Sequence, residues 1–215
     1  MNAAELLTRY AAGERDFTRK DLSGINLRGA DLRNAKFTGA CLVATDLSGA
    51  ILFKTELAHA DLQGANLFGA NLREVDACEA NLCEANLINT DARRINLRGA
   101  YLHKASLHRA NLQEASLSEA IFTAADLSSA ELFESSLVGA NLRRANLSGA
   151  KLCGANLMEA NLQGSNLTGA DLKWATLIDA DLTEADLNQV NLWGAYLGTI
   201  FLSRNSINGV SRSRR

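Results

Sequence analysis

The 215 residues of the chain are enough for one domain with a continuous core, and they include 35 Leu and 35 Ala but no Pro. The 22 basic and 24 acidic side chains leave a formal net charge of −2, which argues against binding of a polyanion and equally against a strongly acidic mimic of one. No apolar run reaches the roughly 18 residues that a membrane helix needs, and the N-terminus lacks the basic and apolar regions of a signal peptide, so we expect a cytoplasmic protein without a membrane contact.

The first predicted element is a short helix over residues 3–12, which has a capping pair at its start, an apolar face and a glycine at its end. The capping pair is Asn2 and Glu5, the apolar face is Leu6, Leu7 and Tyr10, and the stop is Gly13. We assign residues 1–14 to this helix and expect it to close one end of the repeats that follow.

The rest of the chain repeats with a period of five residues. Every fifth residue from Phe17 to Ile207 is a centre, and 33 of these 39 centres are Leu. The position two residues earlier is Ala at 26 of the 36 sites from Ile25 to Ile200, and Asp or Asn precedes 24 of the 39 centres. Of the 16 Gly, 14 lie two residues after a centre. The consensus is therefore A-(D/N)-L-x-x.

A period of five cannot keep one face of an α-helix apolar, because five steps of about 100° turn each leucine away from the last. Ala, Asp or Asn, and Leu alternate inward, outward and inward, as in a short strand. The next two residues form a corner, and glycine at its second position favours a positive φ. Strand and corner then alternate, so that the chain winds into a coil that stacks on itself with the centres inside. Representative inward leucines are Leu62, Leu82, Leu102, Leu112, Leu142 and Leu162.

The runs ADLQGANLFGANL at residues 60–72 and ANLRRANLSGAKLCGANLMEANL at residues 140–162 resemble the pentapeptide repeat family, which is well known in bacteria. The resemblance implies an all-β fold, a right-handed quadrilateral parallel β-helix with four pentapeptides per coil. Residues 15–209 would then form about ten coils. We expect the polar and basic residues 210–215 to be a disordered tail.

With 20 residues per coil, residues i and i+20 are stacked neighbours. One outward column then alternates in sign through Lys54, Glu74, Arg94 and Glu114, which avoids repulsion between like charges. The face whose centres are residues 32, 52, 72 and onward carries seven positive and seven negative charges. We interpret it as a solvated, self-neutralised wall, and no direct binding of nucleic acid is expected.

One candidate contact surface lies on the next face, whose centres are residues 17, 37, 57 and onward. This face carries seven acidic and three basic side chains. Towards its C-terminal end, one outward column becomes apolar, and aromatic residues lie at or near the adjoining corner. The candidate residues are Val138, Met158, Trp174, Ile178, Trp193, Tyr196 and Phe201. They predict an interface with a partner, the alternative being scattered packing of corner side chains.

The C-terminal end of the repeats has no counterpart of the N-terminal helix. Ile200, Phe201 and Leu202 are followed only by a polar segment, so this end either frays or is covered by a second molecule. The family resemblance implies a homodimer joined through the C-terminal ends.

The sequence predicts no catalytic, cofactor-binding or metal-binding residue. Cys41, Cys78, Cys83 and Cys153 lie at outward positions on three faces without stacking on one another, and no C-x-x-C motif is present, so we expect reduced thiols. Cys83 and His103 are stacked in adjacent coils and could formally act as a nucleophile and its base. This pair, however, lies on a convex wall with no pocket around it.

The function that follows is a non-enzymatic structural or interaction protein, a rigid rod that presents flat faces to an unidentified protein partner. The alternative comes from the resemblance alone: some members of the family mimic DNA, bind type II topoisomerases such as gyrase and protect them from quinolones. The net charge of −2 is less acidic than such a mimic requires.

Overall fold

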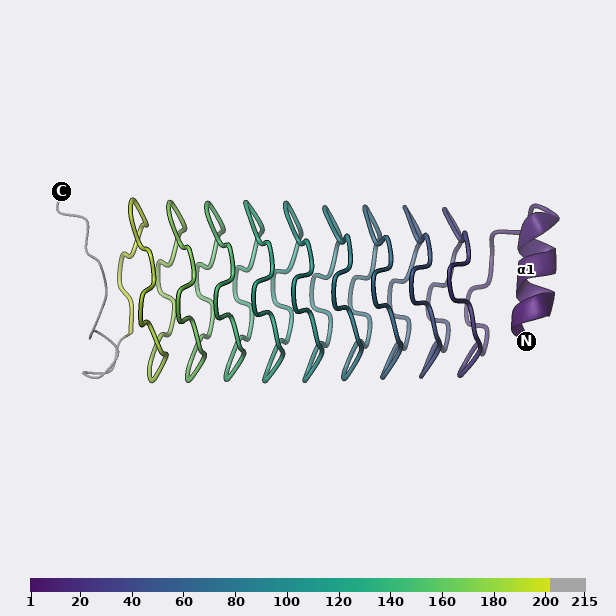
Figure 1. Cartoon of the computed structure of the whole chain (residues 1–215), viewed down its shortest axis with the longest axis horizontal. Helices are drawn as coiled ribbons and strands as arrows, with labels where there is room; N and C mark the ends of the chain where they lie inside the picture. The colour runs from purple at the N-terminus through teal and green to yellow at the C-terminus, as the bar shows by residue number, and fades with distance from the viewer. Residues whose placement is uncertain (202–215) are drawn as a thin grey trace.

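The computed structural model describes residues 1–201, which form a rod with a single helix at its N-terminal end (Figure 1). Helix α1 spans Ala3–Ala11, one residue shorter than predicted. The side chain of Asn2 caps it by accepting a 2.9 Å hydrogen bond from the Glu5 amide. Gly13, at φ +100°, follows the helix, and its amide donates to the Tyr10 carbonyl.

The prediction for the apolar face of α1 is correct for Leu6, which is fully buried, and wrong for Leu7, which is 39% exposed. Consecutive residues of a helix point about 100° apart, so only one of the two leucines can face the first coil. Leu6 takes that position, and Tyr10, one turn later, is half-buried on the same side.

The remainder of the described chain is a right-handed quadrilateral parallel β-helix. Parallel bridges join residue i to residue i+20 at every repeat, from Asp16 with Lys36 to Asp181 with Phe201. Four pentapeptides therefore make one coil. The amide of each centre donates to the coil above, as from Leu62 to the carbonyl of Asn81 over 2.7 Å. The residue before each centre donates to the coil below, as from Asn81 to the carbonyl of Ala60 over 2.9 Å.

Each corner is a four-residue turn closed by a hydrogen bond, for example from the Ala65 amide to the Leu62 carbonyl over 3.0 Å. The second corner residue has a positive φ at every repeat from Arg19 to Gly194, whether or not it is glycine. The sequence predicts this conformation only where glycine is present. Hydrogen bonds to both neighbouring coils impose it on the other residues, although a side chain in this region costs about 1–2 kcal/mol.

The core is a column of leucines alternating with small residues. The six representative leucines are buried as predicted, and none is more than 3% exposed. Two centres are Ala instead of Leu, namely Ala77 and Ala92. Their inward neighbours are correspondingly large: Val75 precedes Ala77, and Thr90 and Ile95 flank Ala92, all of them buried.

The two ends of the described rod differ. At the N-terminal end α1 covers the first coil, and the Tyr10 hydroxyl donates to the Arg33 carbonyl over 2.9 Å. The terminal amine of Met1 donates to the Asp21 carbonyl, which has no coil beneath it. At the other end Leu192 and Leu197 are only half-buried.

The predicted last repeats, up to Gly209, and the predicted tail at residues 210–215 lie outside the described residues. Over residues 1–201, no helix is long and apolar enough to cross a bilayer.

Candidate functional site

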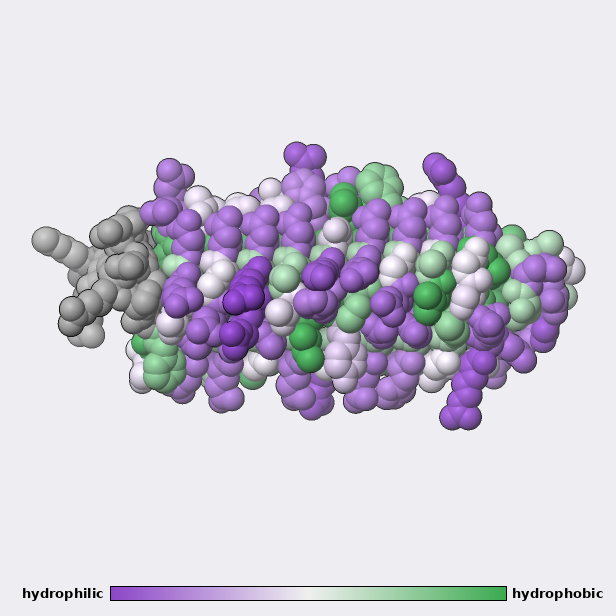
Figure 2. All heavy atoms as spheres, turned by 90° about the horizontal axis from the view of Figure 1, so that it is seen from below, coloured by the Kyte–Doolittle hydropathy of each residue, from purple (hydrophilic) through white to green (hydrophobic). Residues whose placement is uncertain are grey.

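The outward columns form the charge ladders that the sequence predicts. Lys54 and Glu74 lie 3.5 Å apart, and Arg94 binds Glu114 over 2.9 Å. The hydrogen bond from Arg94 lowers the pKa of Glu114 below its ordinary value. Figure 2 shows one side of the rod as regular rows of mostly hydrophilic side chains along the axis. These ladders neutralise the wall internally, although exposed ion pairs contribute little to stability.

Phe53 lies in an outward column with Arg33 and Arg73, and the guanidinium groups of this column contact its ring only in part. The Arg73 guanidinium lies 5.8 Å from the ring centre, and the Lys54 ammonium group also lies over this ring at 5.2 Å. Arg33 instead pairs with Asp31 at 3.2 Å. Local carboxylates therefore compete with the ring for the arginines of this column.

The acidic face contains cross-coil pairs that offset some of its charge. Lys36 lies 3.6 Å from Glu56, and Arg98 binds Glu119 over 3.2 Å. All four groups are at least about half exposed, so water screens both pairs.

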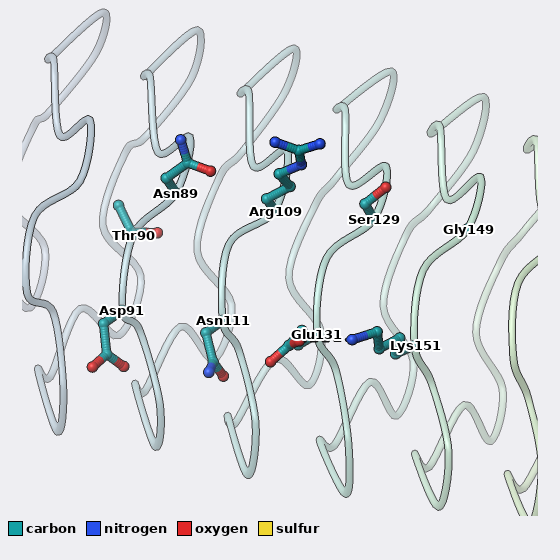
Figure 3. Close-up of a pocket in the computed structure, with 9 residues that line it drawn as sticks. All are labelled: Asn89, Thr90, Asp91, Arg109, Asn111, Ser129, Glu131, Gly149 and Lys151. Atoms are coloured by element: carbon teal, nitrogen blue, oxygen red, sulfur yellow. Dashed lines mark hydrogen bonds and ion pairs between the residues drawn. The ribbon is translucent and has the colours of Figure 1, made fainter.

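A groove of about 650 Å³ runs along one corner of the rod between two columns of outward residues (Figure 3). Its lining residues are Asn89, Thr90, Asp91, Arg109, Asn111, Ser129, Glu131, Gly149 and Lys151. Ser129 has a small side chain and Gly149 has none, so the column of corner residues projects little at these two positions. Lys151 binds Glu131, its stacked neighbour in the same column, over 2.8 Å and lowers the pKa of that carboxyl group. The groove is open and its charges are balanced, and it brings together no cysteine or histidine.

The cysteines do not form a reactive centre in the part of the chain that the structure describes. All four thiols are free and half-buried, and no hydrogen bond joins Cys83 to His103 within residues 1–201. Burial, together with the carboxylates of Glu79 and Asp76, raises the pKa of the Cys78 thiol, which lowers its thiolate fraction. No three metal-binding side chains converge within the described residues either.

The predicted contact residues divide into two groups. Val138, Met158 and Ile178 are half-buried in one outward column. The others are exposed and form what we call the C-terminal aromatic surface, namely Trp174, Trp193, Tyr196 and Phe201, with exposed fractions of 49%, 51%, 63% and 56%. The structure brings the two tryptophans together at one corner. It places Tyr196 on the face that follows this corner and Phe201 on the next face.

The tryptophan pair has a defined geometry. The ring centres of Trp174 and Trp193 are 4.4 Å apart and the rings meet edge to face at 76°. Trp174 itself has φ +59° at the second corner position. Gly194, stacked one coil above it, leaves the space that the indole occupies, because a Cβ at this position would clash with the ring. The indole of Trp174 therefore contacts both Trp193 and Gly194 of the next coil.

In a comparison with protein families, the repeats match a known family model over most of the chain. A model described as pentapeptide repeats matches in eight copies, at residues 16–52 and, as overlapping copies, across residues 60–194. The chain belongs to the pentapeptide repeat family. That model describes a structural repeat and not an enzymatic domain.

Two solved pentapeptide repeat structures illustrate the range of the similarity. HetL from the cyanobacterium Nostoc sp. strain PCC 7120, a protein involved in the regulation of heterocyst differentiation, is 35% identical over 94% of each chain, with a TM-score of 0.67. QnrB1, a plasmid-mediated fluoroquinolone resistance protein, is 20% identical over 85% of this chain and 93% of its own, with a TM-score of 0.51. The second likeness shows the fold alone. No curated protein matches the chain.

Sequence reasoning missed two features of this pentapeptide repeat rod. The first is the role of Gly194, although its position 20 residues after Trp174 could have revealed it. The second is the groove, which is lined by the small residues Ser129 and Gly149 in one corner column. Both features are formed by residues that are 20 positions apart in the sequence and therefore stacked in adjacent coils.

Proposed function

We propose that this chain is a non-enzymatic interaction protein, a rigid rod that presents its C-terminal aromatic surface to a protein partner. The observation that carries the proposal is the exposed pair Trp174 and Trp193, ordered by contact with each other and with Gly194. Tryptophan and tyrosine are enriched among the residues that dominate binding energy at protein interfaces.

The rod supports such a role because it keeps the surface in place. Backbone hydrogen bonds join each coil to the next, and side chains of neighbouring coils pair along the walls. A surface that is already ordered loses little conformational entropy on binding. HetL is involved in the regulation of heterocyst differentiation, a role that fits a protein acting through contacts with other proteins, and we place this chain in the same broad class.

Mimicry of DNA at a type II topoisomerase is less well supported. The similarity to QnrB1 is at the level of the fold, and the walls carry cations paired with acids, such as Arg94 with Glu114, in place of continuous rows of acids. A supercoiling assay with gyrase, run with and without a quinolone, tests this alternative. We expect neither inhibition nor protection by micromolar protein.

The proposal is tested by affinity capture from the native host with two matched double variants. Trp174→Ala with Trp193→Ala removes the exposed indoles. Phe68→Ala with Tyr101→Ala is the control, because these rings are exposed to a similar extent, 46% and 49%, in the middle of the rod.

We expect the double tryptophan variant to capture about one tenth or less of the amount of a specific partner that the wild type captures. The Phe68 and Tyr101 control is expected to capture the wild-type amount. Equal retention by all three proteins would overturn the assignment of this surface. Sedimentation of the same proteins over a range of concentrations tests the homodimer implied by the family, which would use the same end of the rod.

A further inference from the structure

Four cationic side chains in the middle of the rod are not paired with an acid. Lys104, Arg109, Arg143 and Arg144 are exposed, and within residues 1–201 none of them lies at ion-pair distance from a carboxylate. Lys151, in a neighbouring coil, instead binds an acid over 2.8 Å. The four side chains therefore keep their charges available to an anion from outside the chain.

These cations lie on two neighbouring corners of the rod. Lys104 and Arg144 occupy the second position of one corner, two coils and therefore about 10 Å apart, and Arg143 directly precedes Arg144. Arg109 occupies the second position of the next corner, in the same coil as Lys104. The face between the two corners is thus bordered by unpaired cations on both sides.

Short polar side chains cover the face between these corners. Ser106, Asp126 and Asn146 are stacked along it, and His108 and Ser128 lie at its edge with Nδ1 and Oγ 2.8 Å apart. Asp126 is the only acid among the outward residues of this face in the three coils. Its Oδ1 atom already accepts from the Ser128 amide and from the Asn146 side chain, each over 3.0 Å. We call the four cations and these five residues the basic surface.

The groove in Figure 3 continues the basic surface beyond Arg109, which lies in its wall. Both carboxylates that line the groove already have a cation: Arg93 binds Asp91 over 2.7 Å, and Lys151 binds Glu131 over 2.8 Å. The formal charges of the lining residues balance, but these pairs leave Arg109 as the lining residue whose charge is unmatched. An anion from outside would therefore compete with no internal carboxylate for this guanidinium group.

The arrangement of the charges favours an acidic polypeptide over a nucleic acid. Asp126 lies in the middle of the surface, and Glu84 is stacked one coil before Lys104. A continuous row of phosphates would pass close to both carboxylates, whereas the separate carboxylates of a flexible acidic segment can each reach one cation. Tight binding to nucleic acid also commonly uses about six to ten phosphate contacts, more than four cations supply.

We propose that the basic surface binds an acidic segment of a partner protein, whose carboxylates pair with Lys104, Arg109, Arg143 and Arg144. Arginine is suited to this role because its planar guanidinium group can bind both oxygens of a carboxylate. This inference goes beyond the proposed function, since the surface and the chemistry of the partner both differ from those at the C-terminal aromatic surface.

Fluorescence anisotropy with the full chain tests the proposal. The probe is a labelled twelve-residue peptide in which glutamate alternates with glycine, and the same peptide with glutamine in place of glutamate is the uncharged control. A second probe is a labelled seven-nucleotide thymidine strand, which carries the same number of negative charges as the glutamate peptide.

Two triple variants are matched in charge and composition. Each replaces one lysine and two arginines, all exposed and unpaired within residues 1–201, by glutamine. Glutamine is compatible with these corners, because Gln189 already occupies the second position with φ +59°. The test variant carries Lys104→Gln, Arg109→Gln and Arg144→Gln. The matched control carries Arg19→Gln, Lys20→Gln and Arg28→Gln, near the N-terminal end of the rod.

At about 0.05 M salt, we expect the test variant to bind the glutamate peptide about tenfold more weakly than the wild type, and the matched control to stay within about twofold of it. About 0.5 M salt should remove most of the difference, because exposed charges are then screened. The glutamine peptide is expected to bind none of the three proteins measurably.

Because the chain carries other cations, the position of the bound peptide is measured separately. Amide chemical shifts of the isotope-labelled wild type are recorded while the glutamate peptide is added. The largest changes are expected in the three stacked segments of the basic surface, residues 103–109, 123–129 and 143–149.

Four results would overturn the proposal: no binding of the glutamate peptide to the wild type, equal weakening in the two triple variants, the largest shift changes outside the three segments, or tighter binding of the thymidine strand than of the peptide. The last result would assign the surface to nucleic acid. None of these measurements involves Trp174 or Trp193, so failure here and failure of the proposed function are distinguishable.

Discussion

The side-chain amide of Asn66 donates a 3.1 Å hydrogen bond to the carboxylate of Asp46, which lies 20 residues earlier and one coil away. Asn86 donates to Asn66 in the same way over 3.1 Å. An amide can donate to the coil below and accept from the coil above, whereas a carboxylate only accepts. Asp is therefore suited to the start of such a ladder and Asn to its continuation, as in the column of Asp46, Asn66 and Asn86.

Asp46 provides a test of the ladder by pH. Hydrogen bonds from the side chain and backbone of Ser48 hold the pKa of Asp46 below its ordinary value of 3.8. A carboxyl group whose pKa is lower in the folded state stabilises the fold above its unfolded pKa, and this contribution is lost as the pH falls through the folded value. We expect the melting temperature to be nearly constant above about pH 5 and to fall below about pH 4. The fall should be shallower in Asp46→Asn, and calorimetry from pH 7 to 2 measures it; parallel curves would contradict the prediction.

Ser165 is a buried polar residue whose hydroxyl has no hydrogen-bond partner within the described residues. Ser135, which occupies the same inward position in another repeat, donates to the Leu132 carbonyl over 2.8 Å. Ser165→Ala removes an unsatisfied group from a site that usually holds Ala, so we expect a gain of about 1 kcal/mol in the free energy of unfolding. Ser135→Ala is the control and should be neutral or destabilising. Chemical denaturation distinguishes the two, and a loss of stability in Ser165→Ala would refute the prediction.

Gly64 tests the conformational requirement of the corners. It has φ +63°, and a Cβ at this position would meet no atom within 4 Å, so a substitution there changes only backbone strain. Gly64→Ala is expected to cost about 1 kcal/mol, and Gly64→Val more, because β-branched residues are disfavoured at positive φ. Glu84, one coil above with φ +59°, already carries a side chain, and Glu84→Ala should stay within about 0.5 kcal/mol of the wild type. Thermal denaturation of the wild type, Gly64→Ala, Gly64→Val and Glu84→Ala measures these differences in stability. Equal stability of Gly64→Ala and the wild type would contradict the prediction.

Ala92 and Ile95 form a pair in which the usual sizes of the inward residues are exchanged. Ala92→Leu restores the consensus centre but adds volume beside the buried Ile95, so we expect a cost of about 1–3 kcal/mol. Ile95→Ala alone should cost about 2–5 kcal/mol through the cavity that it leaves. The double variant is expected to be more stable than the sum of the two effects predicts. Strictly additive unfolding free energies would show that the two positions do not share core volume.

The C-terminal aromatic surface could be predicted only in part. Trp174, Trp193, Tyr196 and Phe201 are exposed, as their outward positions predict. The edge-to-face contact of the tryptophans and its dependence on Gly194 were not predicted, because they depend on the path of the corner and on the rotamers of two side chains in adjacent coils.

The sequence by itself determined the architecture of this protein. Its unbroken period of five assigns the inward residues from Phe17 to Ile200, and the cap at Asn2 and the stop at Gly13 mark the N-terminal helix. Only the tertiary structure decided that Leu7 faces solvent, that non-glycine corners adopt positive φ, and that a groove forms beside Ser129. The physical reason is that periodicity records which side chains leave water, a local property of each repeat. The conformation of a corner and the contacts of an outward side chain depend instead on hydrogen bonds and neighbours 20 residues away.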